Sequence, residues 1–243
     1  MKRPDHYRGA RFLAKEQKNL GDALLGVIFT GGEGPKAAVV KRIMEKEAKG
    51  AFIVAADSGL IAAREAGINP DFIIGDMDSI DDESTLSSYP PESVSRFERD
   101  KDYTDTELAY FSLLEKGRGE IWIIGGGGGR IDHLFALRSL FERDVFPLRW
   151  LTDAADIRCV DALSGVNELR ANIEKGAIVS VFPLGAGPWE AESAGLKWSL
   201  KGLAWDRGFV AISNIAVEGD FAITAGKGRF MVILPLPVFN TGG

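Results

Sequence analysis

The sequence has one cysteine, two histidines and no long apolar run, and each scarcity excludes a class of structure. With Cys159 alone, the 243-residue chain cannot form an internal disulfide, and the shortage of cysteine and histidine argues against a zinc site. No apolar stretch is long enough to span a bilayer, so we expect no membrane partner. Residues 1–21 mix charges of both signs without the apolar core of a secretion signal. Together these features favour a cytoplasmic protein.

Basic residues are also in the minority. The formal net charge is −6, which argues against a nucleic-acid partner, because such proteins usually present a basic face. Residues 71–107 hold twelve acids against three bases. Crowded carboxylates repel one another unless water or cations offset the charge. This segment is therefore either a solvated acidic face or a site for a divalent metal.

The first half of the chain alternates apolar runs with amphipathic segments. Such alternation predicts a parallel sheet that is covered by helices on both faces. The expected strands are 24–30, 51–56, 72–75, 93–97 and 120–124. The expected helices are 35–49, 60–66, 104–116 and 132–143. Pro35 is expected in the first turn of its helix, and Thr104-x-x-Glu107 has the pattern of a capping box.

The pattern changes after about residue 151. Short apolar or alternating runs, separated by Gly, Pro, Asn and Asp, predict a smaller antiparallel, sandwich-like all-β domain. The expected strands are 157–160, 177–182, 196–200, 209–217, 221–225 and 230–234. We therefore expect a polar extension at 1–22, an α/β nucleotide-binding domain at 23–150 and a β-domain at 151–243.

Each strand of the α/β half ends in a loop that contains Gly, Asp or both. In a parallel sheet these ends share one edge, so the loops are expected to form one crevice. Asp76 and Asp78 follow the strand at 72–75, where two acids give an oxygen-rich site suited to Mg²⁺. Gly31 and Gly32 precede a helix, a pattern that fits either a phosphate-binding loop or a simple tight turn.

Five consecutive glycines at 125–129 precede Arg130, Asp132 and His133. Such a costly run indicates the close approach of a ligand or of another backbone, with a flexible surface loop as the alternative. Arg130 can bind phosphate oxygens, whereas Asp132 and Asp105 could equally be acids that stabilise helix N-termini. We assign His133 no acid–base role.

These motifs, in this order, resemble the thiamine pyrophosphokinase family from about residue 24 to 234. The segments that carry the resemblance are Ala56-Asp57-Ser58-Gly59, residues 70–79, Lys101–Glu107, Gly128–His133, Gly195–Leu200 and Ser213-Asn214. The family often has glycine where Ser58 stands and an aromatic residue where Met77 stands.

The resemblance implies a Mg²⁺-dependent enzyme that transfers diphosphate from ATP to thiamine and works as a homodimer. It implies that Asp76, Asp78 and Asp105 hold Mg²⁺ and the ATP phosphates, with Asp57 beside them as a fourth catalytic acid. The implied ligand-binding residues are Gly31, Gly32, Asp102, Arg130 and Asp132 toward ATP and Trp198, Ser213 and Asn214 toward thiamine. An aromatic wall at Trp198 suits a flat cation, although a place in the β-domain core is the alternative.

Two other functions are weighed against this one. A glycosyltransferase could use Asp76-x-Asp78 to bind a nucleotide sugar, but it predicts neither the Gly128–His133 motif nor an all-β tail. A non-catalytic regulator that binds nucleotide or thiamine would not need the full set of acids.

Overall fold

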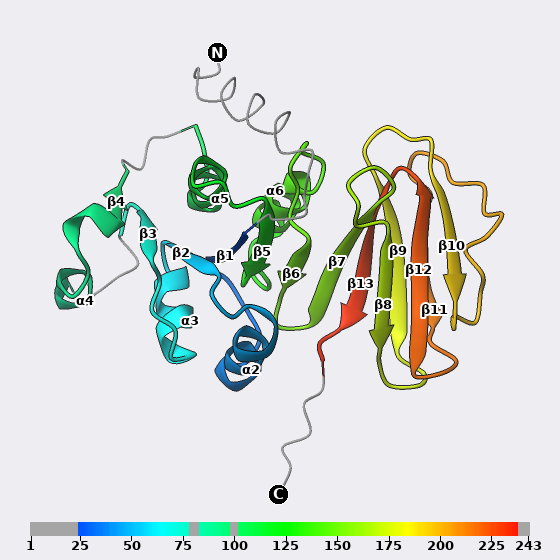
Figure 1. The fold of residues 1–243 in the computed structure, drawn as a ribbon, viewed down its shortest axis with the longest axis horizontal. Coiled ribbons are helices and arrows are strands. Elements are labelled where there is room, and N and C mark those ends of the chain that lie inside the picture. The colour runs from blue at the N-terminus through cyan, green and yellow to red at the C-terminus, as the bar shows by residue number, and fades with distance from the viewer. Residues whose placement is uncertain (1–23, 78–82, 98–101, 238–243) are drawn as a thin grey trace, which may run out of the picture. The chain divides into compact units, whose positions relative to one another are not determined.

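The computed structural model describes residues 24–77, 83–97 and 102–237. The expected polar extension at 1–22 lies outside these residues, as does Asp78. The chain divides into two compact units, one formed by residues up to 147 with 151–153, the other by 148–150 with 154 onward. Strand β6 (Arg149–Leu151) straddles the division (Figure 1). No helix among the described residues is long and apolar enough to cross a membrane.

Unit 1 contains the predicted parallel sheet. Its strands are β1 (Leu25–Phe29), β2 (Phe52–Ala56), β3 (Phe72–Gly75), β4 (Val94–Arg96) and β5 (Glu120–Ile124). They lie in the order β5-β1-β2-β3-β4, and every neighbouring pair is parallel. The central strands are almost wholly buried, as continuous apolar runs predict for a sheet covered on two faces. All five carboxyl ends therefore meet at one edge.

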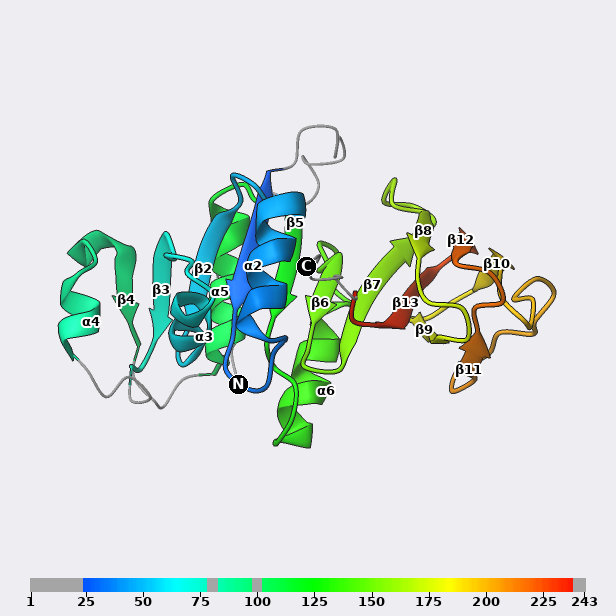
Figure 2. The same cartoon turned by 90° about the horizontal axis from the view of Figure 1, so that it is seen from below.

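Helices cover both faces of this sheet. The helical segments are α2 (Ala37–Glu47), α3 (Gly59–Glu65), α4 (Glu83–Ser87), the 3₁₀ turn η2 (Pro91–Ser93), α5 (Asp105–Glu115) and α6 (Ile131–Leu140). Figures 1 and 2 show α2 and α3 on one face and α5 on the other. The capping box of α5 is confirmed, because Thr104 and Glu107 each bind the other's backbone N–H. Pro35 was wrongly expected inside the first helix: α2 begins after Lys36, its N-cap residue.

Unit 2 is an antiparallel sandwich. Its strands are β7 (Ala155–Asp161), β8 (Glu168–Asn172), β9 (Ile178–Leu184), β10 (Glu190–Ala194), β11 (Ala211–Ile215), β12 (Asp220–Lys227) and β13 (Arg229–Pro235). One sheet has the order β11-β9-β13-β7 and the other β10-β12-β8. Buried side chains of both sheets, including Val181, Ile223 and Phe230, form a common core.

One predicted strand of this unit is absent, and two observed strands were not predicted. Residues 196–200 form no strand, only a single bridge between Leu196 and Ala216. Strands β8 and β10 were missed, because their outward faces carry charged residues and few apolar residues face inward, namely Leu169 and Ala171 in β8 and Ala191 in β10. A search for apolar runs does not detect a strand that has one exposed face and only one or two apolar side chains on the other.

Candidate functional site

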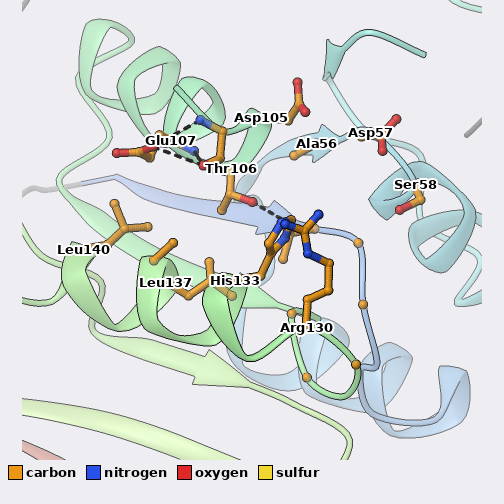
Figure 3. Close-up of a pocket in the computed structure, with 18 of the residues that line it drawn as sticks. Ala56, Asp57, Ser58, Asp105, Thr106, Glu107, Arg130, His133, Leu137 and Leu140 are labelled. Carbon is orange, nitrogen blue, oxygen red and sulfur yellow. Dashed lines mark hydrogen bonds between the residues drawn. The ribbon is translucent and has the colours of Figure 1, made fainter. Parts of the chain in front are cut away.

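A cavity of about 770 Å³ lies at the carboxyl edge of the sheet in unit 1. Loops that follow β1, β2, β3 and β5 contribute to it, together with the first turn of α5 and one side of α6. This is the position at which open α/β sheets bind ligands. The polar and glycine lining comprises Thr30–Glu33, Asp57, Ser58, Asp76, Asp102–Glu107, Gly126–Arg130 and His133. Leu137 and Leu140 of α6 add an apolar wall (Figure 3).

The floor of the cavity consists of two glycine loops bound to each other through their backbones. Glu33 N donates to Gly127 O at 2.7 Å, Gly127 N donates back to Glu33 O at 2.8 Å, and Gly126 N donates to Gly31 O at 2.9 Å. At Gly125, with φ of +102°, an added Cβ would lie 2.3 Å from Thr30 O. The glycine run therefore serves the close approach of another backbone, one of the two uses that its composition predicted.

Three carboxylates occupy the side of the cavity formed by the ends of β2 and β3 and by α5. Asp57 follows β2, Asp76 follows β3, and Asp105 is the first residue of α5. Figure 3 shows Asp57 and Asp105 across the cavity from α6. Asp57 has φ of +49°, a conformation uncommon for a residue with a side chain. Such backbone outliers cluster at functional sites, where surrounding structure holds them.

The first turn of α5 is fixed at two points. The hydroxyl oxygens of Thr30 and Thr106 lie 2.5 Å apart and are buried, which joins the end of β1 to α5. Glu107 accepts hydrogen bonds from Thr104 N and from Arg143 Nη2, and the latter ion pair lies 2.5 Å apart with about one fifth of each side chain exposed. These contacts determine where Asp105 stands relative to the glycine floor.

Arg130 brings positive charge to the opposite side. Its guanidinium donates two hydrogen bonds, at 3.1 and 2.5 Å, to the carboxylate of Asp132. Arg130 is the N-cap residue of α6, and Asp132 lies in the first turn of this helix. These bonds lower the pKa of Asp132 to about 2 and raise the pKa of Arg130. Arg130 and His133 project from the start of α6 toward the cavity (Figure 3). The two-point contact with the Asp132 carboxylate thus orients the guanidinium of Arg130, which stays largely exposed.

The structure brings most of the predicted nucleotide-site residues into this cavity. Those that line it are Gly31, Gly32, Asp57, Asp76, Asp102, Asp105 and Arg130. Asp132 does not line it and instead binds Arg130. Asp78 lies outside the described residues.

Sequence reasoning missed several lining residues. They are Glu33, Tyr103, Thr106, Glu107, His133, Leu137 and Leu140, of which His133 had been noted but given no role. Glu107 had been predicted only as a capping residue. Sequence proximity to predicted site residues was the only available signal for Tyr103 and Thr106. Nothing in the sequence indicated which residues of α6 would face the cavity.

The residues predicted for thiamine lie in unit 2, where Asn214 contacts Trp198. The side-chain amide of Asn214 binds the backbone N–H and C=O of Trp198, at 3.1 and 2.6 Å. Trp198 is 53% exposed and therefore does not belong to the core of the sandwich. Ser213 precedes Asn214 with φ of +61°.

Comparisons with known proteins point to one family, the thiamine pyrophosphokinases. Residues 44–145 match the family model described as thiamin pyrophosphokinase, catalytic domain. This part of the chain is similar to the catalytic domain of thiamin pyrophosphokinases. The matched range includes the carboxylates Asp57, Asp76 and Asp105 on one side of the cavity and the positively charged side chain of Arg130 on the other.

Relatives extend the similarity to thiamine pyrophosphokinases beyond that range. The thiamine pyrophosphokinase of Bacillus subtilis (strain 168) is 27% identical over 189 residues, which cover 74% of this chain and 85% of that protein. A crystal structure of the Bacillus subtilis enzyme covers 88% of this chain and 100% of its own, with a TM-score of 0.69 and 22% identity. Thiamin pyrophosphokinase from Candida albicans covers 88% of this chain and 89% of its own, with a TM-score of 0.62 and 17% identity. At these identities the structures establish the shared fold.

Proposed function

We propose that this protein transfers diphosphate from ATP to the hydroxyethyl oxygen of thiamine, giving thiamine diphosphate and AMP. The observation that carries the proposal is the cavity in the matched catalytic domain, with acids on one side, Arg130 on the other and a glycine floor between them. A polyphosphate needs this combination, because backbone N–H groups and a guanidinium bind its oxygens while carboxylates hold its cation.

In the reaction, the thiamine oxygen attacks the β-phosphorus of ATP and loses its proton. The bond between that phosphorus and the oxygen bridging to the α-phosphorus breaks, and AMP leaves. Charge grows on phosphate oxygens, so positioning and electrostatic stabilisation supply most of the catalysis. Gly31, Gly32 and Asp102 line the ATP side, and Asp132 contributes by orienting Arg130.

Mg²⁺ fits the donor set of this site. Asp76 and Asp105 offer only oxygen, the ligand that Mg²⁺ prefers, and Asp78 would be the third acid, with Asp57 beside them. Among residues 24–77, 83–97 and 102–237, no three acidic, histidine or cysteine side chains form a metal-binding group by themselves. This agrees with Mg²⁺ chemistry, in which one or two carboxylates share the ion with phosphates and water. When bound, the ion would neutralise phosphate charge.

The β-unit is proposed to hold thiamine in a pocket that Trp198, Ser213 and Asn214 help to form. Lys197 Nζ lies 4.6 Å from the centre of the Trp198 ring, a cation–π contact that supports a cation-binding role for this indole. A homodimer is part of the proposal, because β11 is an edge strand and carries the exposed apolar residue Ile212. ATP as donor and a lone buried cysteine are consistent with a cytoplasmic setting.

Product analysis tests the reaction. With ATP, Mg²⁺ and thiamine we expect thiamine diphosphate and AMP in equal amounts, and no product after EDTA. Release of a nucleoside diphosphate from a nucleotide sugar would support the glycosyltransferase alternative instead. Binding of ATP and thiamine without turnover would support the regulator.

Substitution of Asp78 tests the metal assignment. We expect Asp78→Asn to lower kcat by roughly a hundredfold or more while the circular dichroism spectrum stays unchanged. Glu92→Gln is the matched control, because Glu92 belongs to the same acidic segment but precedes β4, at the far edge of the sheet. Full activity of Asp78→Asn would refute the role of this acid.

A further inference from the structure

The side chain of Asn214 is buried and is committed to the backbone of another segment. Only 4% of this residue is exposed. Its Oδ1 accepts hydrogen bonds from Trp198 N at 3.1 Å and from Ile215 N at 2.9 Å, and its Nδ2 donates to Trp198 O at 2.6 Å. Both acceptor positions and one of the two donors are therefore used within the protein.

This contact continues a short ladder between two segments. Lys197 N donates to Ile215 O at 2.8 Å, and Val217 N donates to Gly195 O at 2.9 Å, on either side of the Leu196–Ala216 bridge. In the part of the chain that the structure describes, Lys197 is the last residue of this segment whose backbone pairs with β11. The carboxamide of Asn214 then serves as the partner of the next residue, Trp198, by binding both of its main-chain polar groups.

A local irregularity of β11 accompanies this arrangement. Pairing of β11 with β9 shifts in register between Ala211 and Asn214, and Ser213 between them has φ of +61°. A left-handed conformation is unfavourable for a residue with a side chain, because Cβ then crowds the following carbonyl oxygen. The bonds that Asn214 makes to Trp198 and Ile215 help to offset this cost.

Trp198 needs such an external constraint because half of its surface is exposed. A core tryptophan is oriented by close packing on all sides, whereas an indole that is 53% exposed depends more on the geometry of its own backbone. Two hydrogen bonds to the N–H and C=O of one residue restrict the backbone dihedrals that set the direction of its side chain. They leave the ring itself accessible.

We propose that Asn214 is a positioning residue for Trp198 and does not contact the substrate. It holds the backbone of Trp198 so that the indole is preorganised to stack on a flat cationic heteroaromatic ring. This inference rests on the proposed function, in which that ring belongs to thiamine. Preorganisation of a binding group raises affinity by reducing the ordering that binding requires.

The test is a double-mutant cycle between Asn214 and Trp198. We expect Asn214→Ala to raise the KM for thiamine about tenfold, the effect of losing one preorganised contact, with the KM for ATP changed less than about twofold. In a Trp198→Ala background, Asn214→Ala should add nothing further to the KM for thiamine, because its effect passes through the indole. An equal loss in both backgrounds, or an unchanged KM for thiamine, would overturn the proposal.

Asn172→Ala is the matched control. Asn172 also lies in unit 2 and also donates through its side-chain amide, to Asp220 Oδ1 at 2.7 Å, but on an exposed strand of the other sheet. Its substitution should leave both KM values unchanged. If Asn214→Ala does not fold, Asn214→Asp replaces it, since the aspartate keeps the two acceptor contacts and places an acceptor against Trp198 O.

Amide hydrogen exchange separates this inference from the proposed function. The Trp198 N–H should exchange at least about tenfold faster in Asn214→Ala than in the wild type, the loss expected when one hydrogen bond no longer protects it. This readout needs no substrate. A wild-type protein that makes no thiamine diphosphate would refute the proposed function, whereas an active wild type with unchanged Trp198 exchange in Asn214→Ala would refute the positioning role.

Discussion

Thr30 and Thr106 share a buried hydrogen bond that joins the end of β1 to the first turn of α5. Each hydroxyl is the partner of the other, and both residues are less than one tenth exposed. The bond spans 76 positions of sequence and ties the glycine loop after Thr30 to the turn that carries Asp105. It fixes the first turn of α5 against the end of β1.

A mutant cycle at this pair has a distinctive expected outcome. Thr30→Val and Thr106→Val should each lower the free energy of unfolding by about 1–3 kcal/mol, because each leaves one buried hydroxyl without its partner. The double variant should cost clearly less than the sum, since it removes both polar groups at similar volume. Urea denaturation followed by circular dichroism measures all three. Strict additivity would show that the two hydroxyls do not depend on each other.

Two glycines of the same loop should respond differently to alanine. Gly125→Ala places a Cβ 2.3 Å from Thr30 O at a φ of +102°, so the backbone must move, and we expect a loss of more than about 3 kcal/mol in the free energy of unfolding. Gly129 has φ of +52° and no atom within 4 Å of an added Cβ. Gly129→Ala should therefore cost only about 1–2 kcal/mol, the penalty of the left-handed conformation. Equal losses in the two variants would contradict the close approach at Gly125.

The Arg130–Asp132 pair predicts a specific titration. A carboxyl-detected NMR titration should give Asp132 a pKa of about 2, and Arg130→Met should raise it toward the ordinary value of 3.8. Because the folded-state pKa is the lower one, the pair stabilises the folded state above pH 3.8, and this contribution is lost as the pH falls toward 2. The pair therefore stays intact throughout the neutral range. A titration midpoint near 3.8 for wild-type Asp132 would mean that the two hydrogen bonds from Arg130 to Asp132 do not form in solution.

The parallel sheet was predictable because its signals are local. Largely buried strands such as Phe72–Gly75 are continuous apolar runs, and Gly or Asp marks their ends. The edge at which Asp57 and Asp76 meet then follows from the parallel topology alone. By contrast, β8 and β10 carry charged residues outward and only one or two apolar residues inward. Packing between the sheets therefore decides that they form strands.

The site was predictable where it depends on strand ends and less so where helices supply side chains. The motif at 128–133 indicated Arg130, but it did not indicate that Asp132 would bind Arg130 while His133 lines the cavity. Those roles depend on how α6 is turned about its axis. The apolar wall of Leu137 and Leu140 was missed for the same reason, since apolar residues on a helix are equally expected to face the core.

The main-chain floor of the cavity has a consequence for attempts to redesign the enzyme. Gly31, Gly126 and Gly127 present only peptide groups, so no side chain there can be exchanged to alter the choice of donor nucleotide. Libraries aimed at a different donor should instead vary the walls, at Tyr103, His133 and Leu137. Under the proposed function, the floor binds the phosphates through backbone groups that substitutions leave in place, so nucleotide selectivity has to be changed at the walls of the cavity.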